Sequence, residues 1–142
     1  MRKKLQQLGP QMRHVFIGRF ERVGYKKSYR YCRPTLLLTH VALAETGELI
    51  TDHLWLNYTK GFLDLGELLT GDLLRFNGRV ASYVKGYFGT SQKLDYKVER
   101  PSQVALQAKI EGPRRLLPDT VTKFGRQALI GYIMERERAF YE

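Results

Sequence analysis

The order of strand-type and helix-type segments constrains the fold of this chain more than any other feature of its sequence. Five stretches are rich in Val, Ile and aromatic residues or alternate between apolar and polar side chains, and both patterns predict β-strands. The predicted strands cover residues 13–23, 34–43, 48–57, 73 to about 87, and 93–106, the last of them interrupted at Pro101.

Two segments have helical spacing instead. The first lies between the third and fourth strands, in residues 58–69, and is weakened by Gly61 and Gly66. Its apolar positions are Phe62, Leu65, Leu68 and Leu69. The second covers residues 119–142, where Asp119 or Thr120 can cap a closing helix. Its apolar positions are Val121, Phe124, Ala128 and Tyr132, with Leu129, Ile133 and Phe140 beside them.

Three strands, a short helix, two strands and a helical tail follow the order of the OB-fold, a small five-stranded Greek-key barrel. We therefore predict a mainly β protein with a barrel domain in residues 13–108, preceded by a basic segment, 1–12, and followed by a linker, 109–118, and the closing helix. Gly18 and Gly78 are expected at bends of the barrel. The predicted core consists of Leu37, Ile50, Leu54, Phe76, Val80, Tyr96 and Val98.

The positive charge is concentrated near the start of the chain. The net charge is +10; residues 1–35 hold ten Lys and Arg against one acid, a balance of +9, and residues 36–142 hold fourteen against thirteen, a balance of +1. Concentrated positive charge attracts phosphates and gains affinity from counterion release. Nucleic acid is therefore the leading partner class, followed by an anionic membrane or an acidic protein.

The segment GYKKSYRYCR, residues 24–33, has three tyrosines and four cations and no acid. We expect an exposed loop here, because a core strand could not bury these cations without partners. In an OB-fold this loop and the loop between strands four and five, here residues 85–92, frame the ligand. The residues predicted to bind are Tyr25, Lys26, Lys27, Tyr29, Arg30, Tyr31, Arg33, Trp55, Arg75, Arg79, Tyr83, Lys85 and Tyr87.

Three parts of this set have an alternative interpretation. The loop tyrosines could pack beneath the loop, and the cations of strand four could simply keep an outward face soluble. Trp55 shares the parity of Thr51 and His53 and is either a base-stacking platform or a plug at one end of the barrel.

Nothing in the sequence points to an enzyme. His14, His40 and His53 lie on three different predicted strands, and a metal site would require them to converge with carboxylates such as Asp52. The chain has neither a Gly-rich phosphate loop nor a nucleophile elbow. Its single cysteine, Cys32, allows no internal disulfide. We therefore expect no catalysis, no cofactor and no metal.

Localisation is judged from the apolar segments. No apolar run is long enough to span a bilayer, and the basic start lacks the apolar core of a signal peptide. We therefore expect a cytoplasmic protein that does not bind membranes.

The segments DHLWLNYTKGF, GDLLRFNGRVASYVKGY and LDYKVERPSQV carry a resemblance that extends over residues 13–104. The chain resembles small, functionally unassigned proteins of mobile elements and phages of Gram-positive bacteria. It also looks like OB-fold single-strand-binding proteins in strand order and in the GD-x-x-x-F-x-G-x-V pattern of residues 71–80. It differs from common members of that group because it ends in a predicted helix rather than an acidic tail, so recruitment of repair enzymes by such a tail is not expected.

Two hypotheses about function follow. The first is a non-catalytic module that binds single-stranded DNA or RNA with weak sequence preference. The second is an interaction or inhibitor protein of a mobile element, which docks on a host protein or protein–nucleic-acid complex through the same basic face. The sequence specifies neither an oligomeric state nor a choice between DNA and RNA.

Overall fold

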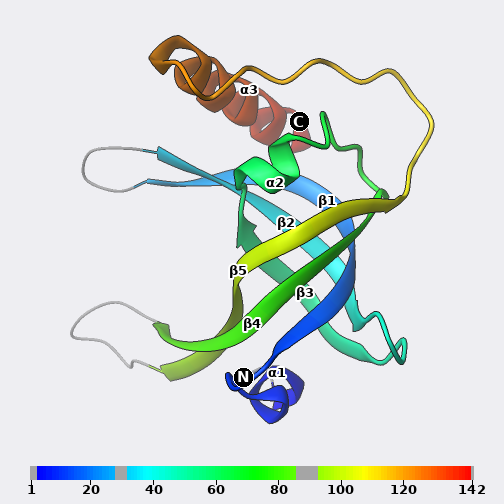
Figure 1. The fold of residues 1–142 in the computed structure, drawn as a ribbon. Coiled ribbons are helices and arrows are strands. Elements are labelled where there is room, and N and C mark those ends of the chain that lie inside the picture. The colour runs from blue at the N-terminus through cyan, green and yellow to red at the C-terminus, as the bar shows by residue number, and fades with distance from the viewer. Residues whose placement is uncertain (1–2, 28–31, 86–92, 142) are drawn as a thin grey trace.

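The computed structural model of the chain describes residues 3–27, 32–85 and 93–141. Within these residues the strands form one five-stranded antiparallel sheet with the order β3-β2-β1-β4-β5 (Figure 1). The elements are α1 (Lys3–Leu8), β1 (Arg13–Lys27), β2 (Cys32–Leu43), β3 (Leu49–Asn57), α2 (Lys60–Leu63), β4 (Leu73–Lys85), β5 (Lys93–Ala108) and α3 (Lys123–Tyr141). The predicted mainly β class, the short helix between the third and fourth strands and the closing helix are thereby confirmed.

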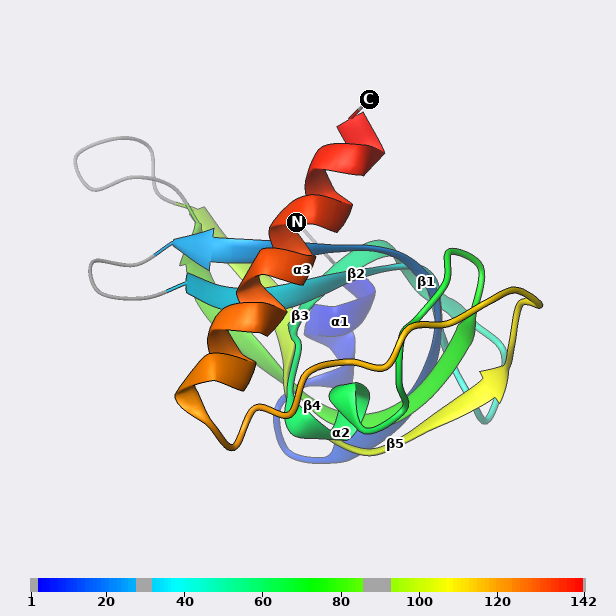
Figure 2. The same ribbon diagram turned by 90° about the horizontal axis from the view of Figure 1, so that it is seen from above.

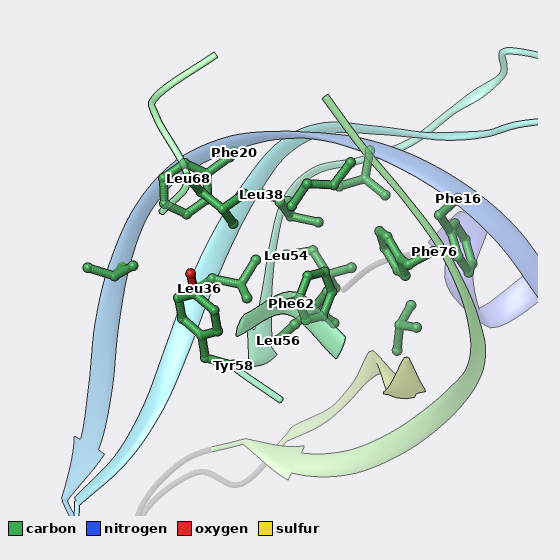
Figure 3. Close-up of a cluster of buried hydrophobic side chains, with 14 of the residues drawn as sticks. Phe16, Phe20, Leu36, Leu38, Leu54, Leu56, Tyr58, Phe62, Leu68 and Phe76 are labelled. Carbon is green, nitrogen blue, oxygen red and sulfur yellow. The ribbon is translucent and has the colours of Figure 1, made fainter. Parts of the chain in front are cut away.

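The sheet is strongly curved. Its edge strands β3 and β5 stand at opposite ends of the strand order, yet Cα atoms of the two strands come within 8 Å of one another. The strands bend around a set of apolar side chains that point into the enclosed space (Figure 3). Phe16, Phe62 and Phe76 are fully buried there, with ring centroids 5.5 Å apart for Phe16 and Phe76 and 6.2 Å apart for Phe62 and Phe76.

Most of the predicted core is confirmed: Ile50, Leu54, Phe76, Val80 and Val98 are buried. Leu37 was assigned to the wrong face. Leu36 and Leu38 point inward, so the alternation of a strand turns Leu37, which is half-buried, to the outer face opposite Trp55.

Two further positions of the predicted inner face are less buried than expected. Tyr96 is only half-buried, although it packs against the core. Val84 shares the strand parity of the core residues Phe76 and Val80 but is 60% exposed. It lies past Arg79, the last residue of β4 that pairs with β1, so β1 does not continue beside it.

Irregular pairing marks the glycines that were expected at bends. The register between β1 and β2 shifts at Gly18. On β4, the neighbours of Gly78 pair with Ser102 and Glu99 of β5. Gly78 therefore faces two residues of β5, Arg100 and Pro101. A Cβ atom at Gly78 would overlap the side chain of Val98. The expected interruption at Pro101 is therefore a bulge inside a continuous strand, a position that tolerates a residue without an N–H.

The helices differ from their predicted extents at three places. The helix between β3 and β4 is limited to α2, because the chain turns at Gly66 with a φ of 84°. The closing helix begins at Lys123 rather than 119, where Thr122 Oγ1 accepts the N–H of Gly125 at 3.0 Å as an N-cap. The basic N-terminal segment contains α1, whose Leu5 is fully buried.

Helix α3 lies across β1 and β2 (Figure 2). Leu129 and Ile133 are its buried residues, whereas Val121 and Phe124, which were expected on its apolar face, are 76% and 85% exposed. Across the described segments, no helix combines the length and the apolar character that crossing a membrane requires.

Candidate nucleic-acid interface

The outer face of strands β1, β2 and β3 presents a cross-strand row of three residues. Arg22 pairs with Leu37, and Leu37 pairs with Trp55. Because Leu54 and Leu56 point into the core, Trp55 between them points outward. This excludes the plug at the barrel end and leaves Trp55 where a ligand could reach it.

Three aromatic rings surround the guanidinium group of Arg22. Its Cζ atom lies 5.0 Å from the ring centroid of Trp55, 4.7 Å from that of Phe140 and 5.4 Å from that of Tyr141. Contacts of this length between a cation and ring faces are attractive. They connect the last turn of α3 to the surface of the sheet.

Gly24 lies closely beneath the tryptophan. A Cβ atom there would lie 3.0 Å from Cζ3 and 3.1 Å from Cη2 of Trp55. The missing side chain lets the ring approach the backbone of β1. A glycine that was predicted to begin a loop thus lies against the aromatic ring.

These residues border an open groove of about 320 Å³, which we call the Trp55 groove. It is lined by Arg22, Gly24, Tyr25, Lys26, Thr35, Trp55, Glu137 and Tyr141. The groove therefore combines aromatic side chains, two cations and one carboxylate between the sheet and α3.

The segment predicted as an exposed loop, residues 24–33, contains the ends of two strands. β1 continues to Lys27 and β2 begins at Cys32, because Gly24 pairs with Thr35 and Lys26 with Arg33 in a continuous hairpin ladder. Gly24 is buried, whereas Lys26, Lys27 and Arg33 are exposed as expected.

The loop tyrosines divide into two groups. Tyr25 is half-buried, packs against the core and lines the Trp55 groove. Its alternative interpretation, packing beneath the hairpin, is thus partly correct. Tyr29, Arg30 and Tyr31 lie outside the described residues.

The predicted binding residues of β4 do not line the Trp55 groove. Arg75 and Arg79 are exposed and pair with Ile17 and Arg13, near the start of β1, whereas the groove lies along its second half. The hydroxyl of Tyr83 donates a hydrogen bond to Asp95 Oδ2 at 3.3 Å. The side chain of Lys85 and all of Tyr87 lie outside the described residues.

A buried ion pair ties the segment before α3 to the sheet. The carboxylate of Asp72 is fully buried. It accepts hydrogen bonds from both terminal nitrogens of Arg114, at 2.7 and 2.9 Å, and from the backbone N–H groups of Leu69 and Ile110. Burial would raise the pKa of Asp72, but these hydrogen bonds outweigh it, and the pKa lies below its usual value.

A second carboxylate holds α3 itself. Glu67, in the connection between α2 and β4, accepts the hydroxyl of Tyr132 at 2.6 Å and the N–H of Arg115 at 2.8 Å. Burial opposes ionisation here too, yet these hydrogen bonds and the nearby charge of Arg136 hold the pKa of Glu67 below its usual range. The two carboxylates thus tie α3 and the segment before it to the rest of the fold.

Sequence analysis missed Glu137, Phe140 and Tyr141 as site residues. A signal was present, because Leu129, Ile133, Glu137 and Tyr141 follow one another at steps of four and therefore share one helix face. His14, His40 and His53 do not converge, and within residues 3–27, 32–85 and 93–141 no group of three or more His, Cys, Asp or Glu side chains could hold a metal ion.

Comparisons with protein families, with curated proteins and with solved structures each found no match to this chain.

Proposed function

We propose that the protein is a non-catalytic OB-fold module of a mobile element or phage that binds single-stranded DNA or RNA in the cytoplasm, with sequence preference weak overall. The observation that carries this proposal is the Trp55 groove, where an outward-facing tryptophan lies beside Arg22 and Lys26. Single-stranded nucleic acid needs flat aromatic faces for its unstacked bases and cations for its phosphates, and each base stack contributes about 1–3 kcal/mol.

The exposed cations of the hairpin extend this surface. Lys26, Lys27 and Arg33 lie at the ends of β1 and β2, next to the groove. Phosphates that follow the backbone of a bound strand can contact these cations while one or more bases enter the groove. Binding would then draw on counterion release and fall with rising salt.

The strand arrangement supports the same proposal. The order β3-β2-β1-β4-β5, with a helix between β3 and β4, is that of an OB-fold, which binds oligonucleotides on the face of its second and third strands. Leu37 and Trp55 belong to that face. The last described residues of the β1–β2 pair, Lys27 and Cys32, and those of the β4–β5 pair, Lys85 and Lys93, end on the same side of the molecule (Figures 1 and 2).

The test is a titration with a fluorescently labelled oligonucleotide, single-stranded or duplex, at several salt concentrations. We expect tighter binding of the single strand and a log–log salt slope of about −0.7 per phosphate contacted. Equal affinity for duplex and single strand would leave only a basic patch without stacking. Failure to bind any oligonucleotide near physiological salt would overturn the proposal and favour docking on an acidic protein.

A further inference from the structure

We propose that the Trp55 groove holds one unstacked nucleobase and that Glu137 makes guanine the preferred base there. This inference rests on the proposed function and makes it more specific. Preference would be confined to one nucleotide, while the rest of the strand is held without regard to sequence.

The carboxylate of Glu137 has no protein partner in the described part of the chain. Glu137 is half-buried and lines the groove, yet its carboxylate forms no hydrogen bond or ion pair with any described residue, although Arg22 and Lys26 line the same groove. Its neighbour Glu135, by contrast, pairs with Arg115 at 3.2 Å. A half-buried carboxylate without a partner retains its capacity to accept hydrogen bonds from a ligand.

The rest of the groove fits a flat aromatic ligand. Trp55 borders it from the sheet and Tyr141 from the helix, with Arg22 in contact with both rings. Aromatic faces and guanidinium planes are the surfaces on which splayed-out bases stack. The volume, about 320 Å³, is at the small end of the range for ligand pockets, about 300–1,000 Å³. This size suits one base rather than a stack of several.

The donors and acceptors on the edge of a base determine how strongly that base can bind the carboxylate of Glu137. An ionised carboxylate only accepts, and its two oxygens match two adjacent donors. Guanine alone presents such a pair on its Watson–Crick edge, the N1–H and the 2-amino group. Cytosine and adenine offer one amino group beside an acceptor nitrogen. Thymine and uracil offer one N–H between two carbonyl oxygens, which a carboxylate repels.

The helix that carries Glu137 is held on both sides of this residue. Tyr132, five residues earlier on α3, is bonded to Glu67, and Phe140 and Tyr141 contact Arg22 on the following turn. These contacts keep the backbone of Glu137 beside the groove, where its side chain can reach the edge of a bound base.

The experiment uses the full chain and three single-stranded probes: an oligothymidylate, the same strand with one central guanosine, and the same strand with inosine there. Inosine lacks only the 2-amino group. We expect the guanosine strand to bind about 5-fold or more tightly than oligothymidylate, as for a bidentate base contact, with the inosine strand in between. Glu137→Gln should remove this difference between the guanosine strand and oligothymidylate.

Glu135→Gln is the matched control, because it makes the same charge change on the same helix outside the groove. It should keep the guanosine preference. A thermal midpoint close to that of the wild type shows that the Glu137→Gln variant is folded. If that variant is unstable, Glu137→Asp tests the same point by shortening the reach of the carboxylate, and it too should lose the preference.

The outcomes separate the two proposals. If the wild type binds all three strands equally, or if Glu137→Gln keeps the guanosine preference, the base-selection proposal is wrong and single-strand binding stands. If the wild type binds none of the strands, both proposals are wrong.

Discussion

Two regions of this molecule have similar residue types and different surroundings. The Trp55 groove joins Arg22, Lys26 and Trp55 to the end of α3, and its aromatic rings and cations meet in one concave place. The outer face of β4 presents Arg75, Arg79 and Tyr83, but Tyr83 already bonds Asp95 and lies under Lys97, whose Nζ is 5.9 Å from its ring centroid. Sequence analysis grouped both regions as one binding surface.

The difference shows that residue type alone does not make a site. On β4 the tyrosine has its own protein partners, and the two arginines stand apart from the Trp55 groove. In the groove, α3 supplies one wall with a carboxylate, Glu137, and an aromatic ring, Tyr141, and a glycine of β1 leaves room for Trp55. We expect the groove to bind and the β4 face to contribute little, and the following variants test this contrast.

The largest effect is expected from removing the buried carboxylate that anchors the segment before α3. Asp72→Ala leaves the guanidinium of Arg114 and two N–H groups without their buried partner, so the free energy of unfolding should fall by about 3–5 kcal/mol in urea denaturation. The exposed pair of Arg115 and Glu135 is the control, since Arg115→Ala should cost about 1 kcal/mol or less. Equal losses for both variants would contradict the assigned role of Asp72.

The same anchor predicts a pH dependence of stability. Because the folded-state pKa of Asp72 is lowered, its contribution is complete above the usual aspartate pKa, about 3.9, and is lost as the pH falls through the folded-state value. Glu67 acts in the same direction. Acid titration followed by circular dichroism should show wild-type stability falling below about pH 4, with a smaller dependence in the Asp72→Ala variant.

Replacing one aromatic residue in each region sharpens the comparison. Trp55→Ala should weaken single-strand binding by about 1–3 kcal/mol, because a stacking surface is lost, and should leave the salt slope unchanged. Tyr83→Ala should leave affinity within about twofold, since Tyr83 does not line the Trp55 groove and its hydroxyl is bonded to Asp95. Similar losses from the two variants, measured with the labelled oligonucleotide, would mean that the β4 face binds as well.

The smallest effect is expected from single cations. Lys26→Ala should weaken binding to all sequences alike and reduce the log–log salt slope by about 0.7, the value for one lost phosphate contact. Arg75→Ala makes the same charge change on β4 and should leave the slope unchanged. A reduced slope in Arg75→Ala would place phosphates on β4 instead.

The strand order could be predicted from the sequence because each element has a clear local signal. Residues 93–98 alternate between polar and apolar side chains, and Phe62 begins a helical repeat directly after a strand-type segment. Both elements appear at the expected place in the structure. The face of Leu37 could not be predicted, because Leu36, Leu37 and Leu38 are all apolar and contain no alternation.

Only the part of the groove that the sheet forms was predicted, because its other side is formed by α3, which is distant in the sequence. Trp55 and Lys26 were identified from local composition. The positions of Glu137 and Tyr141 depend on Arg114 bonding Asp72 and on Tyr132 bonding Glu67, which are tertiary contacts that no local pattern records. Residues 24–27 were predicted to be a loop because of their charged composition, whereas in the structure they pair with residues 32–35 of β2.

The intrinsic fluorescence of Trp55 tests the central claim most directly, because it is the only tryptophan in the chain and lies in the groove. Titration with an unlabelled single-stranded oligonucleotide should quench or shift this emission in step with binding, and duplex of the same sequence should do so less. Binding that leaves the emission unchanged would show that the strand lies elsewhere on the molecule and would contradict the account.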